Sequence, residues 1–253
     1  MNVNISLSKK WLSHIGKWFD QLPPMRVVVI TSLLLSLGSI AYAFLNDYIV
    51  TYGDAESHLN IAKRVLNSIT PGAAQFGGIW LPLPHAMMLP FIWIDPLWRT
   101  GLAGSIVSSI CYIISGIFIY KLVFMITRNK LASYVGFFLF ATNPNILYLQ
   151  ATPMTEIPLI VFFILSTYFF VKFLKDENEL LSLILAAFFA FCAAFSRYDG
   201  WALTAAEALV IILKYLPNRA LWSRMQGRFF LFSTLAFFGN FIVTGKQIGR
   251  AHV

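Results

Sequence analysis

The chain has 253 residues, of which 58% are hydrophobic and only 12% charged, whereas a soluble globular domain carries about 25% charged residues. Several apolar runs have the length of about 20 residues that a helix needs to cross a bilayer, and none shows the alternation of a barrel strand. The formal net charge of +8 comes from Lys and Arg scattered at the ends of apolar runs, which argues against a nucleic-acid-binding face.

We therefore predict an all-α fold: a polytopic transmembrane helix bundle of about seven spans, with a long extracytoplasmic first loop that carries amphipathic or interfacial helices. Residues 1–26 are predicted as a cytoplasmic interfacial segment, because basic residues surround apolar ones at helical spacing near Trp11 and Trp18. A transmembrane module is predicted over residues 27–246. Its candidate spans are 27–46, 102–126, 131–148, 157–174, 180–196, 200–216 and 229–244.

The distribution of basic residues orients this bundle with the N terminus in the cytoplasm. The inside segments then hold Lys9, Lys10, Lys17, Arg26, Lys121, Arg128, Lys130, Lys172, Lys175, Lys214, Arg219, Arg224 and Arg228, and the outside segments hold Lys63, Arg64, Arg99, Arg197 and Lys246. The positive-inside rule supports this orientation. The apolar stretch 83–94 contains Pro84 and Pro90 and is short for a span, so we predict a re-entrant or interfacial helix.

The first outward loop opens with acidic residues. Asp54, Glu56 and His58 begin a predicted amphipathic helix, and Asp54 is placed as its N-cap or first-turn acid. One interpretation is that Asp54 only caps the helix while Glu56 is solvated. The other is that Asp54 accepts the proton of an attacking hydroxyl, with Glu56 as a second catalytic acid.

His58 follows Asp54 by one helical turn, and Trp80 and His85 lie further along the same loop. A helix-surface hydrogen bond between Asp54 and His58 and a divalent metal site that includes His85 both remain open. Because the histidines lack a fixed ligand spacing, the sequence establishes no cofactor, and a divalent metal is the less favoured alternative. Trp80 and His85 are candidates for substrate contact, with an interfacial anchor and a structural hydrogen bond as the alternatives.

Two further polar clusters fall on the same predicted side of the membrane. Thr155 is available to cap the helix that begins near Ile157, and Glu156 is either a first-turn acid favoured by the helix dipole or a catalytic acid. Arg197 needs an anion at its depth, which Asp199, Glu156 or a bound phosphate would supply. We predict that Arg197, Tyr198 and Asp199 bind substrate. Glu207, inside a predicted span, has no evident partner.

The residues Gly53-Asp54-Ala55-Glu56-Ser57-His58-Leu59, Trp80-Leu81-Pro82-Leu83-Pro84-His85, Pro153-Met154-Thr155-Glu156 and Arg197-Tyr198-Asp199-Gly200-Trp201 resemble the GT-C superfamily of membrane glycosyltransferases. The nearest group is the family 39 type, which includes protein O-mannosyltransferases and aminoarabinose transferases. This resemblance implies inverting transfer of a sugar from a polyprenyl phosphate to a hydroxyl of a protein, lipid or glycan outside the cytoplasm, with Asp54 as the base. The family's adjacent acidic pair is here Asp-Ala-Glu, which leaves the role of Glu56 open.

The last residues, Ile248-Gly249-Arg250-Ala251-His252-Val253, match the translation of a common sequencing adapter. We therefore expect residues 247–253 to be an artefact and the chain to be an N-terminal fragment, inactive by itself if the missing part is needed. A polytopic transporter or flippase fragment and a non-catalytic assembly subunit are the alternatives to a transferase. We expect a multi-pass protein of the plasma (inner) membrane, with a bilayer and a lipid-linked sugar as partners and no nucleic acid.

Overall fold

A computed structural model describes residues 23–76 and 80–250, with side chains up to residue 237. Most of the predicted interfacial segment, three residues of the first loop and the last three residues lie outside the described ranges. The helices are α2 (Pro24–Leu45), α3 (Gly53–Asn67), the 3-10 helix η1 (Ala73–Phe76), α4 (Pro82–Ile92), α5 (Asp95–Arg99), α6 (Leu102–Thr127), α7 (Lys130–Ala141), α8 (Pro144–Gln150), α9 (Glu156–Lys175), α10 (Leu180–Ser196), α11 (Gly200–Tyr215) and α12 (Arg219–Arg250). Within the described residues there is no strand, which confirms the all-α prediction.

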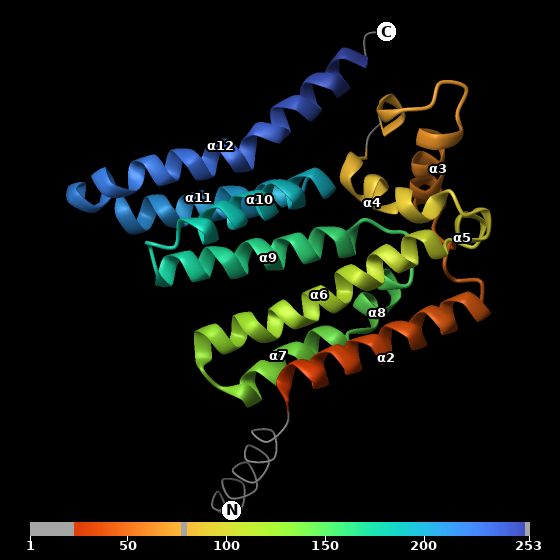
Figure 1. Cartoon of the computed structure of the whole chain (residues 1–253), viewed down its shortest axis with the longest axis horizontal. Coiled ribbons are helices and arrows are strands. Elements are labelled where there is room, and N and C mark those ends of the chain that lie inside the picture. Colours follow the sequence, from red (N-terminus) through yellow and green to blue (C-terminus); the bar gives the residue numbers. More distant parts are fainter. Residues whose placement is uncertain (1–22, 77–79, 251–253) are drawn as a thin grey trace, which may run out of the picture.

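The long helices form a bundle, and the helices of the first loop gather at one end of it (Figure 1). One apolar core joins α2, α3, α4, α6, α7 and α9, and a second joins α9, α10, α11 and α12. Three helices are long and apolar enough to cross a membrane, namely α2, α6 and α9, while α7 and α10 are shorter apolar helices. The structure thus confirms a helical membrane bundle, and the count of seven spans stays a prediction.

The predicted span 131–148 is divided in the structure, so the prediction of one continuous helix is wrong there. Helix α7 ends at Ala141, and α8 begins at Pro144. Proline lacks a backbone N–H and is favoured only in the first turn of a helix. The side chain of Asn143 caps the new helix by accepting hydrogen bonds from the backbone N–H groups of Asn145 and Ile146. The sequence pair Asn143-Pro144 therefore ends one helix and starts another.

Helix α6 satisfies backbone carbonyl groups at the ends of α7 and α8. The hydroxyls of Ser105 and Ser108 donate to the carbonyl oxygens of Ala151 and Thr152, at 2.6 and 3.1 Å. The hydroxyl of Tyr112 donates to the carbonyl oxygen of Ala141 at 2.6 Å. Since an unpaired backbone group in hydrocarbon costs several kcal/mol, these bonds hold the irregular segment before α9 against α6.

Close backbone approach at Gly104 fixes the same segment. A Cβ atom at Gly104 would lie 2.1 Å from Cβ and 2.5 Å from Cα of Pro153. We expect Gly104→Ala to lower the free energy of unfolding by about 1–3 kcal/mol, the usual cost of overpacking. Thermal unfolding in detergent measures this cost. Gly38→Ala is the matched control, because its Cβ would meet nothing within 4 Å and Ala favours helix α2; equal unfolding temperatures for the two variants would contradict the contact.

Inside the second core, Glu207 of α11 has a partner that the sequence did not reveal. The hydroxyl of Ser166 on α9 lies 2.9 Å from both carboxyl oxygens of Glu207, and 2.8 Å from the carbonyl oxygen of Ala186 on α10. Glu207 is 5% exposed. This polar contact therefore joins α9, α10 and α11 within the bundle.

Candidate active site

Arg197 connects three acidic or polar side chains at the end of the bundle where α10 stops. Its Nη1 donates to Oε1 of Glu156 at 2.9 Å and to Oγ1 of Thr155 at 3.0 Å. Its Nε donates to Oδ2 of Asp199 at 3.1 Å. Of the anions considered for Arg197, both protein carboxylates, Glu156 and Asp199, pair with it.

Local backbone structure positions these groups. Arg197 follows the last residue of α10 in extended conformation, and Glu156 is the first residue of α9. Thr155 precedes α9 at the N-cap position, but its side chain makes no capping hydrogen bond and instead accepts from Arg197. The predicted N-cap position of Thr155 is therefore confirmed, but its hydroxyl accepts from the charged guanidinium of Arg197 instead of capping the helix.

The two oxygens of Glu156 differ in their surroundings. Oε1 pairs with Arg197, whereas Oε2 is buried and receives no hydrogen bond from the described residues. A buried carboxylate oxygen without a donor is costly, so such atoms are uncommon in folded proteins and often have a functional role. Glu156 therefore offers an acceptor atom next to the guanidinium of Arg197.

Helix α3 presents its two acids differently. Asp54 and Glu56 both lie in its first turn and are exposed, and Tyr52 rather than Asp54 occupies the N-cap position. A step of two residues turns a helix by about 200°, so the two carboxylates point to different sides of α3. Asp54 shares the side of His58, one turn later, while Glu56 has no hydrogen-bond or ionic partner among the described residues.

The imidazole of His58, on α3 in the first loop, is influenced by charges from two parts of the chain. Burial lowers its pKa to about 4; the charge of Asp54 acts in the opposite direction, and the charge of Arg197 lowers the pKa further. Both charged groups are thus near enough to act on one imidazole. Helix α4 packs against both α3 and α10, so the fold brings the helix that carries Asp54 toward the end of α10, where Arg197 lies.

The hydrogen bond of His58 goes to His85 rather than to Asp54. Nδ1 of His58 and Nε2 of His85 are 2.9 Å apart, and the two side chains are 1% and 0% exposed. Trp80 packs edge-on against His58 at a centroid distance of 5.0 Å. Burial, with a smaller contribution from His58, lowers the pKa of His85 to about 3. One imidazole must therefore donate while the other accepts, and both stay neutral.

This pair predicts a loss of stability in acid. In the unfolded chain a histidine gains its proton near pH 6.5, while the folded pair stays neutral down to about pH 4. Stability is thus complete above pH 6.5 and falls as the pH drops from 6.5 toward 4, by about 2 kcal/mol for each imidazole at pH 5. Thermal unfolding against pH tests this. A variant with both His58→Gln and His85→Gln should show a smaller loss; an equal loss would contradict the account.

The described residues contain no group of three or more His, Cys, Asp or Glu side chains arranged to hold a metal ion. The remaining predicted residues, Tyr198 and Asp199, are exposed, and the ring of Tyr198 packs edge-on against Trp201 at 6.3 Å. Sequence spacing did not reveal the contact of His58 with His85, since a hydrogen bond across 27 residues depends on how α3 packs on α4. The Trp80-to-His85 stretch was the signal that pointed to this part of the loop.

No curated protein and no solved structure matches the chain. The family model described as dolichyl-phosphate-mannose-protein mannosyltransferase matches residues 98–241, which is more than half of the chain. The match includes Glu156, Arg197 and Asp199 and begins near the end of the first loop, after Asp54, His58 and His85. The chain therefore belongs to the dolichyl-phosphate-mannose-protein mannosyltransferase family, whose members are membrane glycosyltransferases that use lipid-linked sugar donors.

Proposed function

We propose that this protein transfers a sugar, with inversion, from a polyprenyl phosphate to a hydroxyl acceptor on the extracytoplasmic side of the membrane. The observation that carries the proposal is the Arg197 cluster, in which one guanidinium holds Glu156 and Asp199. The charges of Arg197 and of Asp54 both act on His58. Such a transfer needs a cation that stabilises the leaving phosphate and a carboxylate that accepts the proton of the acceptor hydroxyl.

Asp54 is the proposed base. The acceptor oxygen attacks the anomeric carbon while the bond from that carbon to the lipid phosphate breaks, and the phosphate leaves with the electron pair. The proton of the acceptor hydroxyl passes to Asp54. Asp54 suits this task because it is exposed in the first turn of α3 and forms no ion pair with the described residues. Glu56 is the less favoured acid, since it projects from another side of the same helix.

Arg197 is proposed to bind the phosphate of the donor. The Asp199 carboxylate that it now contacts is 68% exposed, whereas Glu156 is 27% exposed. An exposed ion pair contributes little free energy, so a phosphate that competes with Asp199 for the guanidinium loses little by displacing it. The more buried contact with Glu156 would then keep Arg197 in position, and preorganised positive charge would stabilise the leaving phosphate.

The other predicted residues would shape the site around these groups. The Oε2 atom of Glu156, which accepts no hydrogen bond from the described residues, would orient an acceptor or sugar hydroxyl. Trp80 would form an aromatic wall for the sugar, held in place by the buried ring of His58 against which it packs, with His85 supporting His58 from behind. Tyr198 and Asp199 would contribute from the exposed hairpin between α10 and α11.

Donor consumption tests this proposal. Membranes that contain the protein are incubated with a labelled polyprenyl-phosphate sugar and hydroxyl acceptors, and free polyprenyl phosphate and labelled product are measured. A transferase releases polyprenyl phosphate and labels an acceptor. A transporter or flippase would move the donor across the membrane intact, and an assembly subunit would leave it unchanged; either result would overturn the proposal.

A further inference from the structure

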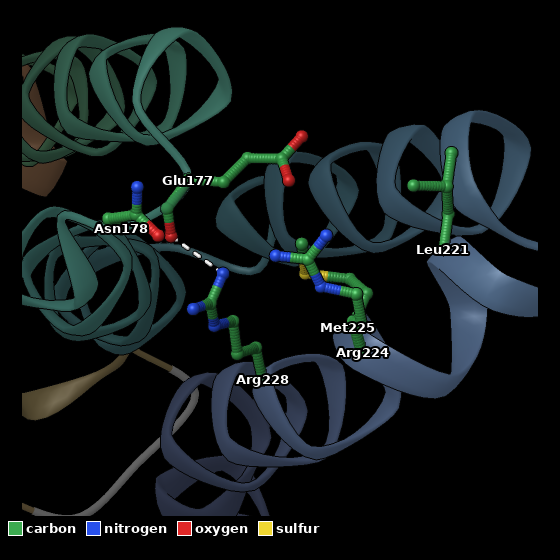
Figure 2. A pocket seen from close by; sticks show the side chains of 6 residues that line it. All are labelled: Glu177, Asn178, Leu221, Arg224, Met225 and Arg228. Atoms are coloured by element: carbon green, nitrogen blue, oxygen red, sulfur yellow. Dashed lines mark hydrogen bonds between the residues drawn. The ribbon is translucent and has the colours of Figure 1, made fainter.

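A second polar site lies at the other end of the bundle. Helix α9 has Glu156 at its first residue and Lys175 at its last, a length of roughly 30 Å at 1.5 Å per residue. Immediately after α9, a cavity of about 330 Å³ opens beside the start of α12. Its lining residues are Glu177, Asn178, Leu221, Arg224, Met225 and Arg228 (Figure 2).

Two guanidiniums face this cavity from one side of α12. Arg224 and Arg228 are four residues apart, so they lie on the same face of the helix. Arg228 donates from Nη1 to the backbone carbonyl oxygen of Glu177 at 2.6 Å, a contact with a neutral group (Figure 2). Arg224 has no hydrogen-bond or ionic partner within the part of the chain that the structure describes.

The one carboxylate that lines the cavity, that of Glu177, already has hydrogen-bond and ionic partners. Oε1 of Glu177 accepts a hydrogen bond from the hydroxyl of Tyr215 at 2.6 Å and pairs with Nζ of Lys214 at 3.3 Å. These contacts, with a smaller contribution from the charge of Arg228, hold the pKa of Glu177 below its usual range, so the group is an anion. One carboxylate thus faces the positive charges of Lys214, Arg224 and Arg228, and the surroundings of the cavity keep an excess of positive charge.

We propose that this cavity binds a phosphate group, supplied by the headgroup of an anionic phospholipid or by the free ion. Two guanidiniums in a cavity of this size match the charge and bidentate hydrogen-bond geometry of a phosphate. Leu221, at the rim, is 40% exposed, and Met225 beneath it is buried. An apolar border next to two arginines is typical of a site that binds a lipid headgroup at the membrane surface. The site is independent of the transfer reaction.

Binding to the intact purified chain tests the proposal. Phosphatidylglycerol and phosphatidylcholine are compared in lipid nanodiscs, and inorganic phosphate is added to the protein in detergent. We expect Arg224→Gln to weaken phosphate-group binding about tenfold, the loss expected for one charge-assisted hydrogen bond, and Arg224→Lys to weaken it less. Arg219→Gln is the matched control, because Arg219 lies on the same helix outside the cavity lining.

The arms distinguish the source of the phosphate. If the protein prefers phosphatidylglycerol over phosphatidylcholine and Arg224→Gln removes this preference, the site binds a lipid headgroup. If the protein shows no lipid preference but binds inorganic phosphate, and Arg224→Gln weakens that binding, the site binds the free ion. The proposal is overturned if Arg224→Gln and Arg219→Gln bind phosphatidylglycerol and inorganic phosphate equally well. It is also overturned if neither variant binds them. The thermal unfolding midpoint of each variant confirms that the folded protein is being compared.

Discussion

Asp54→Asn is expected to lower the rate of sugar transfer by about 10²–10⁴-fold, the contribution typical of a general base. Asparagine keeps the shape of the side chain but cannot accept the proton of the acceptor hydroxyl. Asp54 is exposed and forms no ion pair with the described residues, so the substitution should not disturb packing. The measurement is the initial rate of labelled product formation in membranes that contain equal amounts of wild-type and variant protein.

Asp47→Asn is the matched control for this experiment. Asp47 is another exposed carboxylate, just after α2, and its φ of 57° is a conformation that asparagine adopts readily. We expect this variant to transfer sugar at the wild-type rate. If Asp54→Asn kept the wild-type rate as well, Asp54 would have no part in the mechanism and the proposed base would be wrong.

Arg197→Gln is expected to lower transfer by about 10²–10³-fold, as removal of one preorganised group that stabilises transition-state charge does in other enzymes. The substitution removes the cation that holds Glu156 and, in the proposed mechanism, the donor phosphate. Arg197→Lys should restore little, because a single ammonium cannot reproduce the three directed hydrogen bonds to Thr155, Glu156 and Asp199. Initial rates over a range of donor concentrations give kcat and KM separately.

A purely structural role for Arg197 would give a different result. Loss of a phosphate contact raises the KM for the donor or lowers kcat in protein that remains folded, whereas loss of a structural ion pair lowers the unfolding temperature and the amount of active protein. Arg99→Gln is the control, since Arg99 is 69% exposed and pairs with Asp95 in the first loop. Wild-type kcat and KM in folded Arg197→Gln would show that Arg197 does not bind the donor.

The helical part of the fold follows from local sequence pattern. Apolar runs place α2, α6 and α9 within a few residues of their observed bounds, because the length of an apolar helix is set by the bilayer. Two spans differ from the prediction. The span 131–148 is divided at Pro144 because average hydropathy does not register a missing backbone N–H group. Helix α12 begins at Arg219, before the predicted span 229–244, because polar residues near its start lower the hydropathy without ending the helix. The acidic first turn of α3 was likewise predicted correctly, since it depends only on neighbouring residues.

The candidate site was predictable only in part, because its contacts join distant helices. Charge topology placed Glu156 and Arg197 on one side of the membrane, but it left three anions open as partners of Arg197. The observed bond to Glu156 spans 41 residues and depends on how α9 packs against α10. The same holds for His58, whose partner is His85 rather than the nearby Asp54. The partner of each side chain depends on how the helices pack together, and the spacing of residues along one helix does not determine that packing.

The anomeric configuration of the product tests the proposed transfer most directly. A single displacement, with Asp54 as base and the lipid phosphate as leaving group, inverts the configuration of the sugar carbon. The product made from a labelled polyprenyl-phosphate sugar of known configuration is therefore isolated and its anomeric linkage determined by NMR. Our account predicts a linkage opposite to that of the donor. A product with the donor's configuration would require two displacements through a covalent intermediate and would contradict the account.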